Sequence, residues 1–93
     1  MEVQHRKSEG GGTFYIVFND EPAAELVYSL VQGNRMVIEH TEVSDELRGR
    51  NIGQELVRAA VDFARESGMK VVPTCPFARA VLDKKPEWAD VRA

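Results

Sequence analysis

The stretch that decides the fold is VSDELRGRNIGQEL, residues 43–56. A strand-like segment ends at Val43, a polar connection carries two arginines and two glycines, and an amphipathic helix begins near Ile52. The first turn of a helix exposes amide N–H groups that lack intrahelical acceptors, and the helix dipole is positive there. Small residues let a phosphate approach those amides, and Arg48 and Arg50 add positive charge. The stretch therefore predicts an anion site, most naturally for a diphosphate, although the two glycines could instead serve only a turn and close helix–sheet packing.

The residues after this stretch predict a helix, a strand and a second helix. Apolar residues recur at helical spacing at Ile52, Leu56, Ala60 and Ala64, and Gly68 is a natural stop. Residues 70–73 then predict a short buried strand, and Pro76 suits the first position of another helix. The spacing places Phe77, Ala80 and Val81 on one side of that second helix, and we expect Phe77 to belong to the core.

The residues before it predict four extended segments, at about 2–7, 13–18, 23–30 and 35–43, with a turn over the glycine-rich residues 8–12. In the fourth segment, alternation places Val37, Glu39, Thr41 and Val43 on one face and Met36, Ile38, His40 and Glu42 on the other. Short turns favour antiparallel neighbours, whereas a right-handed helical crossover makes the last two strands parallel. The order β-β-β-β-α-β-α therefore predicts a mixed α+β fold with a mostly antiparallel five-stranded sheet.

Composition narrows the class of protein. The chain has 93 residues, a formal net charge of −3 and one cysteine. This length predicts a single domain over residues 1–93, and one cysteine excludes a disulfide framework or a multi-cysteine metal site. No apolar run approaches the ~20 residues that cross a bilayer, and the polar start does not resemble a signal peptide, so we expect a soluble, cytoplasmic protein. The slight acidity argues against binding to duplex nucleic acid.

Residues 48–53 (RGRNIG) resemble the acetyl-CoA signature of the GNAT acetyltransferase superfamily, Gln/Arg-x-x-Gly-x-Gly/Ala, in its strand–loop–helix context. Residues 38–43, 71–78 and 85–88 resemble a small single-domain branch of that superfamily, so the resemblance covers nearly the whole chain. Two positions depart from the pattern. Asn51 stands where a glycine is usual, and Trp88 replaces a tyrosine, which removes a phenolic hydroxyl. Asn tolerates left-handed backbone better than most residues, so the loop shape is expected to survive.

This resemblance implies that strands four and five splay around a site for acetyl-CoA, the co-substrate. It implies that the diphosphate and pantetheine contacts come from Val43, Arg48, Gly49, Arg50, Asn51, Ile52 and Gly53. The implied activity is transfer of an acetyl group to an acceptor, which could be a small amine, a protein lysine or a thiol. No metal is implied, and we expect a monomer or weak oligomer.

Two residues are candidates for the chemistry. Cys75 precedes Pro76, where a helix N-terminus favours the thiolate, and in the superfamily it would lie near the thioester. It could equally be a small buried hydrophobic residue. His40 is a natural base near pH 7, or else a histidine packed beside Met36 and Ile38. Glu39 and Glu42 are further candidates for the base.

A second class of function competes with the enzyme: a module that binds CoA or an acyl-CoA without turnover and acts through a protein partner. The short chain, which leaves little material for an acceptor pocket, favours this module, whereas Cys75 favours the enzyme. A nucleic-acid-binding sheet would need exposed aromatic residues among basic ones, and Tyr15 is instead surrounded by apolar residues.

Overall fold

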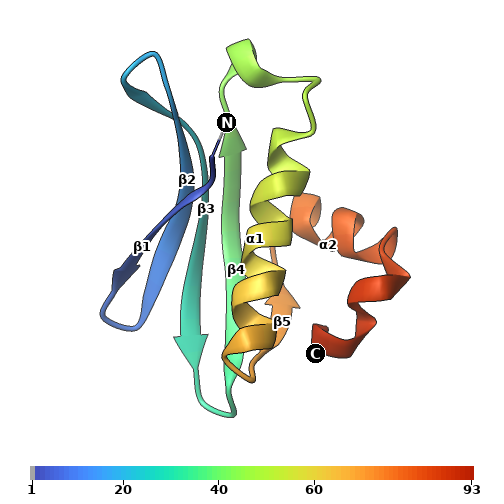
Figure 1. Ribbon diagram of the computed structural model, residues 1–93. Helices are drawn as coiled ribbons and strands as arrows, with labels where there is room; N and C mark the ends of the chain where they lie inside the picture. The colour runs from blue at the N-terminus through green and yellow to red at the C-terminus, as the bar shows by residue number, and fades with distance from the viewer. Residues whose placement is uncertain (1) are drawn as a thin grey trace.

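The computed structural model describes residues 2–93 and contains one mixed five-stranded sheet (Figure 1). The strands are β1 (Gln4–Ser8), β2 (Gly11–Phe18), β3 (Glu21–Val31), β4 (Arg35–Val43) and β5 (Lys70–Pro73). They are ordered β1-β2-β3-β4-β5, with β4 and β5 parallel and every other neighbouring pair antiparallel. The predicted fold class and the parallel pair are confirmed.

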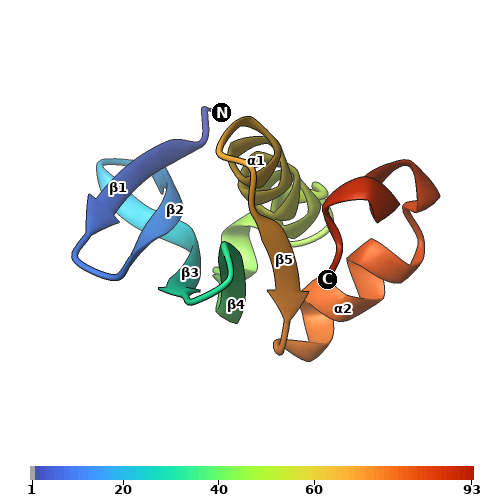
Figure 2. The same ribbon diagram turned by 90° about the horizontal axis from the view of Figure 1, so that it is seen from below.

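One face of the sheet is covered by α1 (Ile52–Glu66), and α2 (Pro76–Asp83) lies beside β5 (Figure 2). The apolar stripe of α1 packs on the inward side chains of the central strands, and several side chains at this contact are fully buried: Leu26, Met36, Ile38, Leu56, Val57 and Val61. Burial of a large aliphatic side chain contributes about 1.5–3 kcal/mol, so this layer supplies much of the stability. Two short 3-10 helices, η1 (Asp45–Leu47) and η2 (Pro86–Val91), were not predicted.

The glycine-rich turn is shorter than expected. Only Glu9 and Gly10 form the turn, with Gly10 at φ +77°, whereas Gly11 and Gly12 belong to β2. A side chain at Gly12 would lie 2.5 Å from the Tyr28 hydroxyl oxygen, so this glycine makes room for a neighbouring strand's side chain. The glycine at position 12 is therefore explained by close packing between strands and not by reversal of the chain.

The predicted faces of β4 are wrong beyond Ile38. Tyr28 pairs with Ile38 but Val27 pairs with His40, which leaves Glu39 as an extra residue in a β-bulge. The extra residue reverses the alternation. Thr41 therefore lies on the same face as Ile38, toward α1, and His40 lies on the opposite face.

The C-terminal segment fixes β5 and α2. Arg65 of α1 holds Asp90 of η2 with two hydrogen bonds of 3.0 and 2.9 Å, and Val71 of β5 forms a bridge to Arg92. The Arg92 side chain in turn donates to Asp83 at the end of α2, at 2.5 Å. These contacts position the junction between β5 and α2, which carries the single cysteine.

Phe77, Ala80 and Val81 share one side of α2, as predicted, but Phe77 does not belong to the core as expected. The buried residues of α2 are Ala78 and Leu82, whereas the ring of Phe77 is 43% exposed. Because Phe77 follows Pro76 in the first helical turn, its ring projects toward the start of α1 and not into the layer beneath the sheet. Ala80 and Val81 lie on the same side as Phe77 and line a cavity with it.

Candidate functional site

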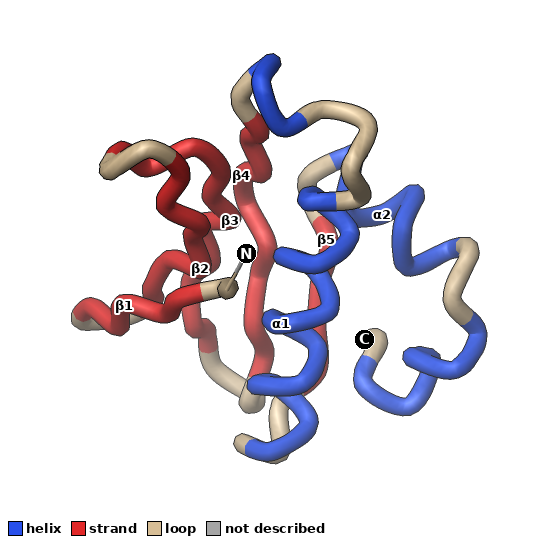
Figure 3. Tube along the Cα trace, turned by 45° about the horizontal axis from the view of Figure 1, so that its top comes forward, coloured by secondary structure: helices blue, strands red, loops and turns tan. Residues whose placement is uncertain are grey.

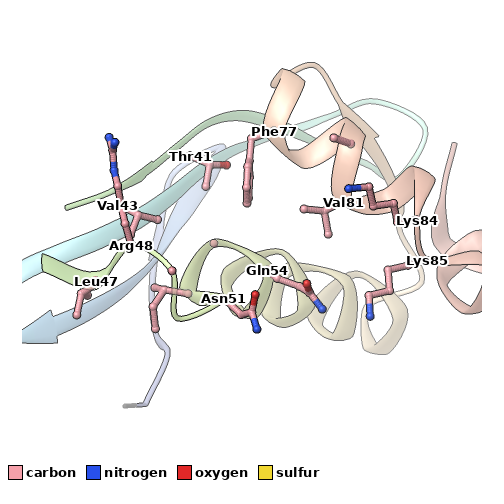
Figure 4. A pocket seen from close by; sticks show the side chains of 14 residues that line it. Thr41, Val43, Leu47, Arg48, Asn51, Gln54, Phe77, Val81, Lys84 and Lys85 are labelled. Carbon is pink, nitrogen blue, oxygen red and sulfur yellow. The ribbon is translucent and has the colours of Figure 1, made fainter. Parts of the chain in front are cut away.

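A cavity of about 630 Å³ opens between the end of β4, the beginning of α1 and one side of α2 (Figure 4). Its middle is apolar and is formed by Val43, Leu47, Ile52, Phe77, Ala80 and Val81. Three cationic side chains also line it, Arg48, Lys84 and Lys85, and no carboxylate does among the described residues. In a chain of net charge −3, this distribution favours a ligand that is both apolar and anionic.

The beginning of α1 provides hydrogen-bond donors to this cavity. The chain leaves β4, passes through η1 and arches over the end of the sheet before α1 begins (Figure 3). Gly49 has φ +83° and Asn51, the N-cap, has φ 58°, and no side chain caps the helix. The first-turn amides therefore stay free for a ligand, as an anion site requires.

The predicted diphosphate residues are mostly brought together. Val43, Arg48, Gly49, Asn51, Ile52 and Gly53 all line the cavity. Arg50 is exposed and does not line it. The guanidinium of Arg48 makes an exposed ion pair with Asp45 at 3.1 Å, which is worth little in water and leaves Arg48 able to reorient.

Gly53 has a second role that the sequence left open. A Cβ atom at this position would lie 2.7 Å from Cε2 of Phe77, because the phenyl ring covers Gly53. The absence of a side chain thus lets α2 approach α1 closely. The sequence had suggested close packing of a helix on the sheet as one interpretation of this glycine, but the contact is between two helices, and it does not exclude a role at the ligand.

Strands β4 and β5 part at the cavity. Their last pair is Ile38 with Pro73, after which β5 ends while β4 continues to Val43. The Ile38 carbonyl accepts hydrogen bonds from the Thr74 amide, the Thr74 hydroxyl and the Cys75 amide, at 3.1, 2.9 and 3.2 Å. This carbonyl therefore marks the point where the gap between the two strands begins.

Cys75 lies at this gap as the N-cap of α2. Its Sγ is 3.6 Å from Oγ1 of Thr41, so the thiol can donate to the hydroxyl, or the thiolate can accept from it. Burial acts to raise the pKa of the Cys75 thiol, but hydrogen bonds from the amide of Ala78, the Thr41 hydroxyl and the amide of Phe77 outweigh it, and the pKa is lowered. The thiol is 8% exposed and does not itself line the cavity.

His40 is not brought together with Cys75. The bulge turns it to the face of the sheet away from α1, where its Nε2 lies 3.3 Å from Oε2 of Glu42. Both side chains are more than half exposed. The packing of His40 beside Met36 and Ile38, which the sequence left open, is wrong for the same reason.

Two residues that line the cavity, Thr41 and Phe77, were placed wrongly from the sequence. Thr41 was assigned to the face opposite Ile38 because strict alternation hides a bulge. Phe77 was assigned to the core because its aromatic character alone does not show which way a first-turn side chain projects. The sequence did contain one signal for Phe77. Gly53 lies in the first turn of one helix and the aromatic Phe77 in the first turn of the next, and the two residues meet in the structure.

The described part of the chain contains neither a cluster of metal-binding side chains nor a helix that could span a membrane. Within residues 2–93, no group of three or more His, Cys, Asp or Glu side chains is placed to hold a metal ion. Over the same residues, no helix is long and apolar enough to span a membrane.

Comparison with known proteins defines the class. The family described as GCN5-related N-acetyl-transferase matches residues 13–91, so the chain belongs to this family. Protein NATD1 from Danio rerio is 35% identical over 87 residues, which make up 92% of this chain and 77% of that protein. The chain spans only 56–58% of the length of the Xenopus, chicken, mouse and human forms of NATD1 that it also matches.

Solved structures agree with this assignment. The solution structure of a GCN5-like protein from Staphylococcus aureus is 36% identical, with a TM-score of 0.76 over 97% of this chain and 87% of that one. A Bacillus anthracis protein crystallised in complex with acetyl coenzyme A is 18% identical, with a TM-score of 0.64 over 82% of this chain and 46% of that one. The five-stranded sheet with its parallel β4–β5 pair is the GNAT fold.

Proposed function

We propose that this protein binds acetyl-CoA in the cavity between β4, α1 and α2 and transfers its acetyl group to an acceptor. The observation that carries the proposal is the position of that cavity. It runs from the uncapped start of α1, where a diphosphate would accept from backbone amides, to Thr41 of β4 and Phe77 of α2, which follow the point where β4 and β5 part. An apolar middle with cationic side chains at its rim suits an extended pantetheine arm that carries phosphates.

The binding residues then have separate roles. The amides at Gly53 and Gln54 hold the diphosphate, with Arg48 and Arg50 supplying charge from the loop. Gly49 and Asn51 keep the loop in its left-handed turn, and Ile52 provides apolar contact at the helix start. The main chain of Val43, at the free end of β4, pairs with the amides of the pantetheine arm.

We propose Cys75 as the nucleophile of a covalent route. The Cys75 thiolate attacks the thioester carbonyl carbon, a new C–S bond forms, and the bond from that carbon to the sulfur of CoA breaks. CoA leaves as a thiolate and takes up the proton that Cys75 released. The acceptor then attacks the acetyl-cysteine, the acetyl group passes to it, and the Cys75 thiol is restored. The lowered thiol pKa and the nearby Thr41 hydroxyl support this role.

A direct route would use His40 instead. In this route the acceptor attacks the thioester carbon from the face of the sheet away from α1, and His40, oriented by Glu42, takes the acceptor proton. The bond from that carbon to the sulfur of CoA breaks as the new bond forms, and CoA leaves as a thiolate that takes up the proton from His40. Glu25 pairs with Glu42 across the β3–β4 ladder, and like charges so placed repel unless a cation relieves them. This face therefore favours a cationic amine over a thiol as acceptor. Glu39, the bulged residue, is a further candidate for the base.

A non-catalytic CoA-binding module remains the second candidate, and one observation favours it: the buried Cys75 thiol does not line the cavity. Calorimetric titration with acetyl-CoA and CoA, followed by mass spectrometry of the intact protein without acceptor, separates the candidates. The covalent route predicts one added acetyl group in the wild type and none in Cys75→Ala. The direct route predicts no acetyl-protein but transfer to an added lysine peptide or diamine, which His40→Gln abolishes.

Absence of both products, with acetyl-CoA still bound, would identify the module. Absence of binding by a folded protein would overturn the proposed function altogether.

A further inference from the structure

The cavity has a second cationic end at the C-terminal turn of α2. Lys84 and Lys85 line it there, and their side chains lie across from Gln54 of α1 in Figure 4. The helix ends at these residues, where the Lys84 and Lys85 amides donate to the carbonyls of Val81 and Leu82, both at 3.1 Å. Their placement is therefore fixed by the backbone of the helix.

Neither lysine is engaged by a carboxylate within residues 2–93. Asp83, which is adjacent in sequence, is held by Arg92 at 2.5 Å, so this carboxylate is already paired. Lys85 has its Nζ 5.6 Å from the centre of the Trp88 ring, and Trp88 is nearly buried, so this contact restrains the lysine side chain. The two charges thus stay available to a ligand in the cavity.

The two lysines lie at the opposite end of α2 from Cys75, the proposed nucleophile. Lys84 is nine residues beyond Cys75, and nine residues of α-helix rise about 13 Å. The gap between the strands, where the thioester is proposed to lie, is at the Cys75 end, and the uncapped start of α1 is the other source of positive potential. A ligand that reaches from this gap to both sources of positive potential carries anionic groups remote from its thioester.

CoA has two such groups, the diphosphate and the 3′-phosphate of its ribose. Building on the proposed function, we propose that Lys84 and Lys85 form a separate subsite for the ribose 3′-phosphate. The subsite selects the free CoA thioester over the same acyl-pantetheine attached to a carrier protein, which lacks both the adenosine and this phosphate. Lysine suits the task because its ammonium group is a compact point charge that can meet a phosphate.

Calorimetric titration with CoA, 3′-dephospho-CoA and 4′-phosphopantetheine tests this subsite. We expect wild-type protein to bind CoA roughly tenfold more tightly than 3′-dephospho-CoA, a ratio that shrinks as salt is added. In the double variant Lys84→Gln/Lys85→Gln, CoA affinity should fall to that of 3′-dephospho-CoA, while the affinity for 3′-dephospho-CoA and 4′-phosphopantetheine stays unchanged. Lys84→Gln alone keeps the Lys85–Trp88 contact and should give part of the loss.

Arg79→Gln is the matched control, since Arg79 lies on the same helix, is exposed and does not line the cavity. This variant should keep the full wild-type ratio. Equal binding of CoA and 3′-dephospho-CoA by the wild type would overturn the subsite and leave the proposed function standing. An equal loss for both ligands in the double variant would also overturn it, because the lysines would then act on a shared group or on the fold. Failure of the folded wild type to bind any of the three would overturn both proposals.

Discussion

The phenyl ring of Phe77 covers Gly53, so the first turns of α1 and α2 meet without a side chain between them. This contact forms part of the wall of the cavity, and the ring is 43% exposed there. One glycine therefore meets two requirements: the observed close packing of the helices and, in the proposed function, access of a ligand to backbone amides.

Gly53→Ala separates these requirements. The added Cβ would lie 2.7 Å from Cε2 of Phe77, so the ring must swing into the cavity. Since that ring is the far end of a mobile side chain, we expect a cost of only about 1 kcal/mol in the free energy of unfolding but a clear loss of acetyl-CoA affinity. Urea denaturation and calorimetry measure the two effects. The double variant Gly53→Ala/Phe77→Ala should regain affinity; if it stays as weak as Gly53→Ala, ligand access to the backbone is the requirement that matters.

Asn51→Gly tests the departure from the family signature. Asn51 has φ 58°, a left-handed conformation that glycine adopts without strain. We expect acetyl-CoA affinity to stay equal or to rise, because the substitution removes both strain and bulk beside the diphosphate. Asn51→Ala is the control, and it should destabilise the fold by about 1 kcal/mol because a Cβ without a polar group is disfavoured there. A large loss of affinity in Asn51→Gly would instead show that the amide side chain touches the ligand.

The pH dependence of alkylation reports on Cys75. Its lowered pKa means that the thiolate persists at lower pH than in a free peptide, so the midpoint of the iodoacetamide rate profile should lie below that of a model cysteine. The midpoint is the diagnostic quantity, because burial slows the absolute rate at every pH. Thr41→Val removes one stabilising hydrogen bond and should raise the midpoint. Thr13→Val, on the far side of the sheet, should not change it.

His5 predicts a loss of stability in mild acid. Its ring stacks on Phe14 with centroids 4.0 Å apart, and its Nε2 lies 2.5 Å from the Tyr28 hydroxyl, which donates to the neutral ring. Burial, with a smaller effect from Lys7, lowers the His5 pKa below its ordinary value near 6.5. The neutral form is thus favoured by folding, so its contribution is present above pH 6.5 and is lost as the pH falls through the lowered pKa.

The free energy of unfolding, measured by urea denaturation between pH 7.5 and 5, should therefore fall more in the wild type than in His5→Phe. His40→Gln changes an exposed side chain and should retain the wild-type dependence. An identical dependence in the wild type and His5→Phe would contradict this assignment.

Much of the fold could be predicted because its signals are local. The helical spacing from Ile52, the turn glycines and Pro76 each fix one element with little help from the rest of the chain. The loop from Arg48 to Gly53 was predictable for the same reason. Thr41 was not, because a bulge depends on how β4 pairs with β3, and pairing leaves no mark in the alternation of β4 itself. The exposure of Phe77 depends on how α2 docks against α1, which is a tertiary relationship.

The bulge at Glu39 has a consequence for the tolerance of β4 to change. Deletion of Glu39 would remove the bulge and make Ile38 and His40 direct neighbours, so regular alternation would keep Thr41 and Val43 on the face toward α1 and His40 and Glu42 on the other face. Replacement of Glu39 by another residue also leaves these faces unchanged. Loss of Thr41, by contrast, would move Val43 to the opposite face, so β4 is expected to tolerate a deletion at the bulge far better than one beyond it.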